Sequence, residues 1–180
     1  MKTNENTSKQ QTSNTGGSEK SLLTELFENE LKGMYWSENA LTEALPKMID
    51  SAASPELKEA LQNHLTETKE HVIKVEKVFE ILGQSPQTEE CEAMAGLLKA
   101  GEKVMSNTSE GPQRDAGIIA AGQKVEHYEI ASYGTLSAFA ETLGLDDAVE
   151  ILDEILEQEK NADETLSNVA ASTFNIEAAR

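Results

Sequence analysis

The sequence has 180 residues, which suits one domain and a tail. It carries 15 lysines and arginines against 33 aspartates and glutamates, giving a net charge of -18. This negative charge would repel the phosphate backbone of nucleic acids and the anionic surface of membranes, so we expect neither as a partner. Cations are the partners that such a charge favours.

Cysteine content and hydropathy bear on where in the cell the protein is expected. The single cysteine, Cys91, cannot form an internal disulfide, which agrees with a reducing environment. No apolar run approaches the ~18 residues that a membrane-spanning helix needs, and the first residues lack the apolar core of a signal peptide. We therefore expect a cytoplasmic protein without a membrane-spanning segment.

The first 20 residues are polar and contain no Val, Ile, Leu or aromatic side chain, so they predict a disordered tail over 1–20. A helical domain is expected over 21–172 and a second tail over 173–180. Between Phe27 and Met48 apolar side chains recur at alternating spacings of four and three residues, which is typical of a helix. Glu38 occupies one position of this apolar seam.

A second helix is predicted to begin at the Ser-Pro-Glu segment 54–56, where serine suits the N-cap and proline the first helical position. Gly83 is its expected C-terminal cap. The apolar seam between these ends includes His64 and His71, and Glu67 lies on its flank. This helix therefore places two imidazole side chains at seam positions where apolar side chains are expected.

Three more helices are predicted from the second half of the chain. Residues 91–105 indicate a short helix, and a loop is expected over 106–115. A third long helix then ends at Gly144, and a fourth runs from about Asp146 to Ala171.

The fold class predicted from this pattern is all-α, because no strand pattern appears. Four helices of roughly 25–30 residues would form a bundle about 40 Å long at 1.5 Å per residue. Short links make the first pair and the last pair of long helices two antiparallel hairpins. The segment 84–111, which carries the additional short helix, is long enough to cross between them.

Each long helix turns at least one carboxylate toward the predicted interior, near its midpoint. A buried carboxylate costs several kcal/mol unless it is paired, and a bound cation would compensate several at once. The alternative is that these acids only flank the apolar stripes. Their recurrence on all four helices at a similar depth favours a metal site. The candidate ligands are Glu38, His64, Glu67, Glu126, Glu129, Glu159 and Asp163.

Carboxylates with imidazole suit iron or manganese, and six or seven ligands fit two ions better than one. Structural zinc would favour cysteines, and calcium would favour an Asp-rich loop. His71 faces the same way as His64 and is expected to support the ligands or fill the core. Tyr133 is expected either to bond a ligand carboxylate or to fill the core, and His127 to lie outside the site.

Several segments resemble the YciE/YciF family of bacterial stress proteins, over residues 21 to about 171. The resemblance implies a ferritin-like bundle, a homodimer, a di-metal site and a ferroxidase-like activity, and it implicates the same seven ligands. KVEHYEIASYGTL (124–136) is the most specific segment. The others are LKGMYWSENALTEALPKM, SPELKEALQNHLTET, CEAMAGLL, AAGQKVEHYEIASYGTLSAFAETLG and LEQEKNADETL.

The spacing of the ligands departs from the ferritin-like superfamily, which commonly uses Glu-x-x-His on two helices. Here the second helix has the reversed order, His64-x-x-Glu67, and the third has two glutamates, Glu126-x-x-Glu129. The predicted centre is therefore richer in carboxylate and poorer in histidine than that pattern, which favours hard metal ions.

Three functions follow from these observations. The first is a di-iron or di-manganese oxidoreductase, a ferroxidase or a consumer of peroxide, with O₂ or peroxide as oxidant. The second is a non-catalytic stress protein in which any metal is structural. The third is a storage shell like ferritin, although no feature of the chain marks the symmetric interfaces that a cage needs. Sub-stoichiometric metal together with full stability in EDTA would favour the second function over the first, and molecular size separates the third.

Overall fold

The computed structural model describes residues 21–171, and all regular structure within that range is helical. The prediction of an all-α fold with four long helices and a shorter one is confirmed. The predicted tails, 1–20 and 173–180, lie outside the described residues. The helices are α1 (Leu22–Ser51), α2 (Pro55–Ile81), α3 (Glu92–Asn107), α4 (Pro112–Leu143) and α5 (Asp146–Val169).

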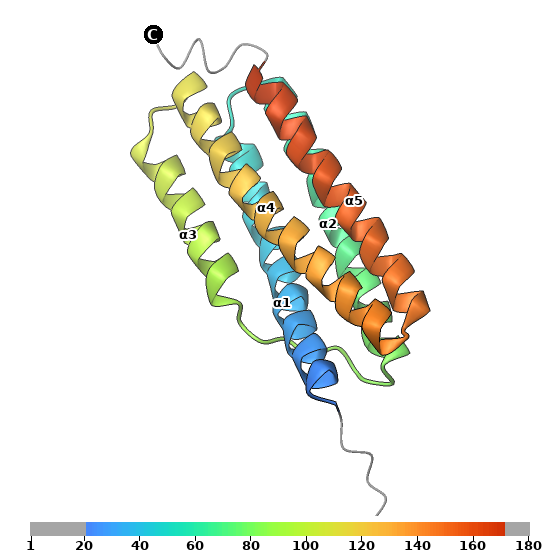
Figure 1. Ribbon diagram of the computed structural model, residues 1–180. Coiled ribbons are helices and arrows are strands. Elements are labelled where there is room, and N and C mark those ends of the chain that lie inside the picture. Colours follow the sequence, from blue (N-terminus) through green and yellow to red (C-terminus); the bar gives the residue numbers. More distant parts are fainter. Residues whose placement is uncertain (1–20, 172–180) are drawn as a thin grey trace, which may run out of the picture.

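The long helices form a bundle of two antiparallel hairpins, α1 with α2 and α4 with α5 (Figure 1). Helices α1 and α5 run in one direction, and α2 and α4 run in the other. Each long helix packs against two others, because α1 and α5 both contact α2 and α4. The hairpins are joined by a connector and α3, which packs outside the bundle against α4 and α1. The segment 84–111, predicted to cross between the hairpins, does so at one end of the bundle, and α3 then runs along the bundle to the other end, where α4 begins (Figure 1).

Helix ends follow the local sequence. The Ser54 hydroxyl accepts a hydrogen bond from the backbone N–H of Leu57 at 3.3 Å, and Pro55 begins α2 as predicted. Gly83 follows α2 with φ +69°, and Gly144 ends α4 with φ +70°. Both lie in the left-handed region that glycine adopts without steric cost, so each helix stops where its hairpin or connector turns.

Helix α4 begins earlier than the sequence predicted. A loop was expected through residue 115, but the helix starts at Pro112, since proline suits the first helical position. Asp115 is buried in the first turn, where its carboxylate accepts the backbone N–H groups of Ala53 at 2.8 Å and Ser54 at 2.9 Å. These bonds tie the α1–α2 turn to the start of α4 and so connect the two hairpins.

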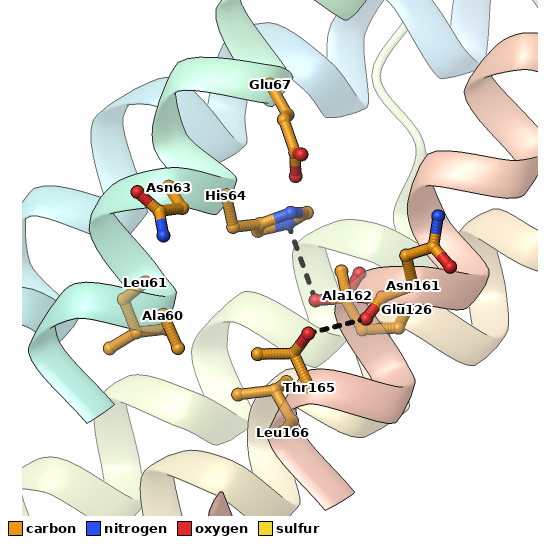
Figure 2. A pocket seen from close by; sticks show the side chains of 10 residues that line it. All are labelled: Ala60, Leu61, Asn63, His64, Glu67, Glu126, Asn161, Ala162, Thr165 and Leu166. Carbon is orange, nitrogen blue, oxygen red and sulfur yellow. Dashed lines mark hydrogen bonds and ion pairs between the residues drawn. The ribbon is translucent and has the colours of Figure 1, made fainter. Parts of the chain in front are cut away.

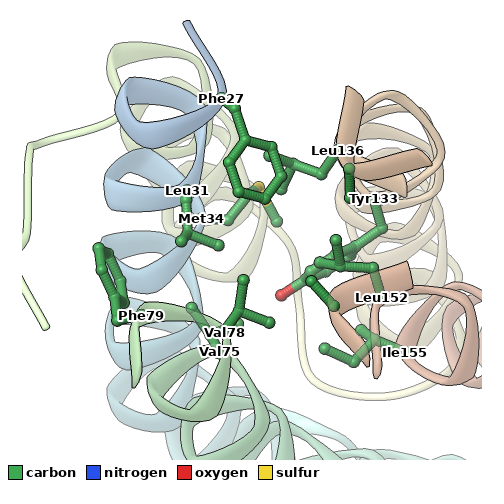
Figure 3. Close-up of a cluster of buried hydrophobic side chains, with 12 residues drawn as sticks. Phe27, Leu31, Met34, Val75, Val78, Phe79, Tyr133, Leu136, Leu152 and Ile155 are labelled. Atoms are coloured by element: carbon green, nitrogen blue, oxygen red, sulfur yellow. The ribbon is translucent and has the colours of Figure 1, made fainter. Parts of the chain in front are cut away.

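Two clusters of buried apolar side chains fill the interior. The first draws on all four long helices (Figure 3), and the second draws on α3 as well. Members of the first are Phe27, Leu31, Met34, Val75, Val78, Phe79, Tyr133, Leu136, Ala140, Ala148, Leu152 and Ile155. Members of the second are Leu41, Leu45, Met48, Ala52, Leu57, Leu61, Met94, Ile118, Ile119, Val125 and Leu166.

A layer of ionisable side chains separates the two apolar clusters. On every long helix, the residues between its contributions to the two clusters include at least one buried acid or imidazole. The fold therefore encloses a polar layer between two apolar ones. The layer consists of Glu38 on α1, His64 and His71 on α2, Glu126 and Glu129 on α4, and Glu159 on α5.

Among residues 21–171, no helix combines the length and the apolar character needed to cross a membrane.

Candidate metal centre

The polar layer is almost completely enclosed. Glu38, Glu129 and Glu159 are 0% exposed, and Glu126 is 2% exposed. Placing one unpaired carboxylate in such surroundings costs several kcal/mol, and four together would also repel one another. The layer therefore needs positive charge, from protonated histidine, from protons on the acids themselves, or from cations.

The ionisable side chains of the layer form two groups that share Glu159. In each group, one ligand atom from every member lies within 4.8 Å of the others. Each group draws its members from three different helices, so an ion held in either would connect three helices. The His71 group is Glu38, His71 and Glu159, and the His64 group is His64, Glu126, Glu129 and Glu159.

The His71 group is held together by polar contacts. His71 Nδ1 lies 2.9 Å from Glu159 Oε1 and 3.5 Å from Glu38 Oε1. The Tyr133 hydroxyl donates a hydrogen bond to the same oxygen of Glu38. Burial alone would lower the pKa of His71, but its close polar contacts with Glu159 and Glu38 and their negative charge outweigh burial and raise this pKa to about 10. A protonated His71 thus supplies the positive charge of this group when no cation is bound.

The other ring nitrogen of His71 begins a chain of contacts toward the surface. His71 Nε2 lies 3.2 Å from the side-chain oxygen of Gln158 on α5. Lys74 Nζ donates a hydrogen bond to the same oxygen at 2.6 Å and lies 3.1 Å from Glu154 Oε1. The Glu154 side chain is 63% exposed, so the chain of contacts ends at solvent.

The His64 group has fewer internal contacts. His64 Nε2 lies 3.4 Å from Glu126 Oε1, and among residues 21–171 neither oxygen of Glu129 forms a hydrogen bond. Burial, followed by the charge of Glu159, raises the pKa values of Glu126 and Glu129 well above the ordinary range. Burial lowers the pKa of His64. Without a cation, Glu126 and Glu129 therefore favour the neutral acid form beside a neutral imidazole.

Glu38 and Glu159 differ in their protonation. Burial raises the pKa of Glu38, and the contacts with His71 oppose this only in part. Burial also acts to raise the pKa of Glu159, but its close contact with His71 Nδ1 and the positive charge of His71 outweigh burial and lower it. The shared residue Glu159 is therefore the carboxylate that most readily stays ionised.

The donors fit bound cations. A hydrogen-bonding atom enclosed in a native protein almost always has a partner, yet both oxygens of Glu129 and Oε2 of Glu38 form no hydrogen bond among the described residues. Carboxylate oxygens with imidazole nitrogens are the donors that iron and manganese accept.

Two of the seven predicted ligands lie at the edge of the centre. Glu67 is half-buried on α2 and lines a cavity beside His64 (Figure 2). Asp163 lies on α5, with Oδ1 3.5 Å from Gln123 Nε2 and 3.6 Å from His127 Nε2. Neither belongs to the His64 group or the His71 group. The ligand role of both residues stays a prediction.

His71 is more central than the sequence suggested. The sequence favoured a supporting or core-filling place, whereas its Nδ1 lies among the candidate ligand atoms. The available signal was its spacing of seven residues from His64, because two helical turns bring a side chain back to the same face. The side chain of His127 is 70% exposed and lies outside both groups, as expected.

Comparisons with known proteins agree with this architecture. The model of a family described as a domain of unknown function, DUF892, matches residues 22–179. Protein YciF of Escherichia coli (strain K12) is 38% identical over 157 residues, which is 87% of this chain and 95% of YciF. The crystal structure of the E. coli stress protein YciF matches with a TM-score of 0.82, covering 85% of this chain and 97% of that one. YcfI from Rhodopseudomonas palustris is 40% identical, with a TM-score of 0.80, over 82% of this chain and 94% of YcfI.

The likeness in fold extends further. A structure of ferritin like, diiron-carboxylate proteins from Bacillus anthracis has a TM-score of 0.59 at 14% identity, covering 82% of this chain and 96% of that one. At this identity the likeness concerns the fold alone, and it confirms the ferritin-like bundle that the sequence resemblance implied. On the family match and the identity to YciF, the chain belongs to the YciE/YciF family of bacterial stress proteins.

Proposed function

We propose that this chain is a di-metal carboxylate stress protein that binds two ions of iron or manganese. The observation that carries the proposal is the pair of enclosed donor groups that share Glu159. Glu129 gives the clearest support, since neither of its buried oxygens forms a hydrogen bond among the described residues. Bound cations would supply the partners that these oxygens lack.

One ion would be held by the His71 group and the other by the His64 group. Iron or manganese bound there would supply electron transfer to O₂ or peroxide, the chemistry of a ferroxidase or a peroxide-consuming enzyme. The chain contributes the surroundings of that chemistry. The two apolar clusters exclude water from both sides of the polar layer, and Tyr133 orients Glu38 through its hydroxyl.

A second function is supported by the placement of the donors on different helices. Because each group draws ligands from three helices, bound ions would cross-link the bundle and stabilise the fold without any turnover. In that case the protein would be a structural stress protein whose metal only maintains the bundle.

Metal stoichiometry followed by oxidation kinetics tests the proposal. The metal-free chain is loaded with Fe(II) or Mn(II) without oxygen, and bound metal is counted by elemental analysis. We expect two ions per chain and faster loss of Fe(II) after addition of O₂ or peroxide than in buffer alone. Two ions without faster oxidation would support the structural function. Failure to bind stoichiometric metal would contradict both functions.

Assembly is tested in the same preparation. We propose a homodimer, and size-exclusion chromatography with light scattering distinguishes a dimer from a ferritin-like cage.

A further inference from the structure

A cavity of about 160 Å³ lies between α2 and α5 and reaches the His64 group (Figure 2). Asn63 and Asn161 on its wall are exposed, Glu67 is half-buried, and His64 and Glu126 are buried. The wall therefore extends from solvent to two candidate ligands. Figure 2 shows the Glu67 carboxylate directed toward the His64 ring.

The chemistry of the wall favours cations. Two carboxylates, those of Glu67 and Glu126, face the cavity, and no lysine or arginine among residues 21–171 lines it. The side-chain oxygens of Asn63, Asn161 and Thr165 are further neutral donors for a hard ion. The imidazole of His64, whose ring nitrogens form no hydrogen bond among the described residues, stands at the buried end.

The size of the cavity suits an ion with part of its water shell. Its volume of about 160 Å³ has room for several water molecules, because ~10–15 Å³ of such space is enough for one. Sites for organic ligands of drug size are larger, at ~300–1,000 Å³. A second cavity, between α1, α3 and α4, is no alternative, because no member of the His64 or His71 group lines it.

We propose that this cavity is the route by which divalent cations reach the metal centre, and that Glu67 binds them transiently on the way. The inference rests on the proposed di-metal function. It explains why Glu67 faces the centre and yet belongs to neither donor group. A transit ligand speeds arrival and departure alike, so its loss changes the rates of binding and leaves the equilibrium nearly unchanged.

The test measures Co(II) binding to the metal-free full-length chain by stopped-flow visible absorbance, with chelator extraction for the reverse rate. Removing one charge from the route by Glu67→Gln should slow loading by about threefold to tenfold. Extraction should slow by a similar factor, so that affinity and stoichiometry stay close to those of the unsubstituted chain. Glu59→Gln is the matched control, because Glu59 is exposed on the same helix and does not line the cavity.

Two further variants narrow the route without removing a polar group. Ala60→Leu and Ala162→Leu place bulk on opposite walls, and both should slow loading while leaving stoichiometry intact. A Glu67→Gln variant that loads at the normal rate but binds weakly would overturn the proposal, because Glu67 would then be a resident ligand. Normal loading in both leucine variants would place the route elsewhere. Failure of the unsubstituted chain to bind Co(II) would instead contradict the di-metal function itself.

A separate observation concerns the tautomer of His71. An ammonium group can only donate hydrogen bonds, so the Gln158 atom 2.6 Å from Lys74 Nζ is the amide oxygen. The same oxygen lies 3.2 Å from His71 Nε2 and can only accept, so Nε2 carries a hydrogen. Nδ1, which faces Glu38 and Glu159, then holds the lone pair whenever the ring is neutral.

The geometry points to Gln158 as a positioning residue that, held by Lys74, fixes His71 in the tautomer able to bind a cation through Nδ1. This inference also rests on the proposed di-metal function. Gln158 has no direct part in either donor group, so it would act only through His71.

Co(II) titrations of three variants test this role. Gln158→Leu should weaken binding at the His71 group by about 10–100-fold, because no acceptor then keeps the hydrogen on Nε2. Gln158→Glu keeps an accepting oxygen and should restore the affinity. Lys74→Met should cause a smaller loss, because the amide becomes free to turn. Unchanged affinity in Gln158→Leu, or equal losses in Gln158→Leu and Gln158→Glu, would overturn the inference.

Discussion

His64 and His71 lie seven residues apart on the same face of α2, yet their surroundings differ. His71 is 0% exposed, contacts Glu38, Glu159 and Gln158, and has a raised pKa. His64 borders a cavity, its ring nitrogens form no hydrogen bond among the described residues, and burial lowers its pKa. The same residue type at the same helical phase therefore has two roles, which the neighbouring helices decide.

This comparison implies that the two halves of the metal centre are assembled differently. The His71 group is already ordered by an ion pair and by the hydrogen bond from Tyr133. In the His64 group, the oxygens of Glu129 form no hydrogen bond within residues 21–171, so a bound cation would provide most of its order. We expect the two ions to bind with unequal affinity and to exchange at unequal rates.

The largest effect is expected from Glu159→Ala, because Glu159 belongs to both groups. Bound metal should fall from two ions per chain to none that survives gel filtration, as measured by elemental analysis. Glu157→Ala is the matched control, since Glu157 is exposed on the same helix. A Glu159→Ala protein that keeps one tightly bound ion would show that one group functions without the shared carboxylate.

Glu129→Leu should separate the two groups. This change removes a member of the His64 group only, so metal should fall from two ions to one. In the metal-free protein the same change removes a buried carboxyl whose oxygens form no hydrogen bond in the described part of the chain, and the free energy of unfolding should rise by about 1–3 kcal/mol. Urea unfolding in EDTA measures this gain.

Glu141→Leu, at an exposed position of the same helix, controls for the general effect of leucine. A metal-free Glu129→Leu protein less stable than the unsubstituted chain would mean that Glu129 has a stabilising partner among the other groups of the layer.

Sequence periodicity predicted the helices and most of the centre. Apolar seams and the caps at Ser54, Gly83 and Gly144 are local features, so the bundle and its hairpins could be predicted from the chain alone. Glu38 and Glu159 lie inside for the same reason, because each replaces carbon within an apolar stripe.

Which side chains lie at the centre of the polar layer and which at its edge could not be predicted from periodicity. Three residues advance a helix by about 300°, so Glu67 is turned about 60° from His64 and lies at the edge of the seam. Whether such a residue is a ligand depends on how α2 and α5 are rotated against each other. The orientation of Asp163 toward α4, and the place of His71 between Glu38 and Glu159, likewise depend on helix packing.

The pH dependence of metal-free stability should distinguish the two histidines. The folded pKa of His71, about 10, exceeds its ordinary value of 6.5. Its contribution is therefore fully present below pH 6.5 and is lost as the pH rises through 10. The folded pKa of His64 is lowered, so its contribution is lost only as the pH falls below 6.5.

The raised pKa values of Glu126 and Glu129 act in the same direction as that of His71, since the folded state binds more protons. The free energy of unfolding in EDTA should thus rise as the pH falls from 10 to 6.5. His71→Asn should flatten this slope and His64→Asn should preserve it, as measured by urea unfolding at each pH. Equal slopes in the two variants would contradict the difference between the histidines.

The smallest effect is expected from Tyr133→Phe, which removes only the hydroxyl that orders the His71 group. The ring is 0% exposed and packs in the first apolar cluster (Figure 3), so phenylalanine keeps the packing. The lost hydrogen bond to buried Glu38 should lower the free energy of unfolding by about 1–2 kcal/mol. Tyr35→Phe is the matched control, because its hydroxyl donates to half-buried Glu76 at 2.6 Å, where water can replace it. Urea unfolding of both variants in EDTA should therefore show the larger loss for Tyr133→Phe. If the two losses are equal, the Tyr133 hydroxyl does not preorganise the His71 group. The greater order of the His71 group, compared with the His64 group, must then come from His71 alone.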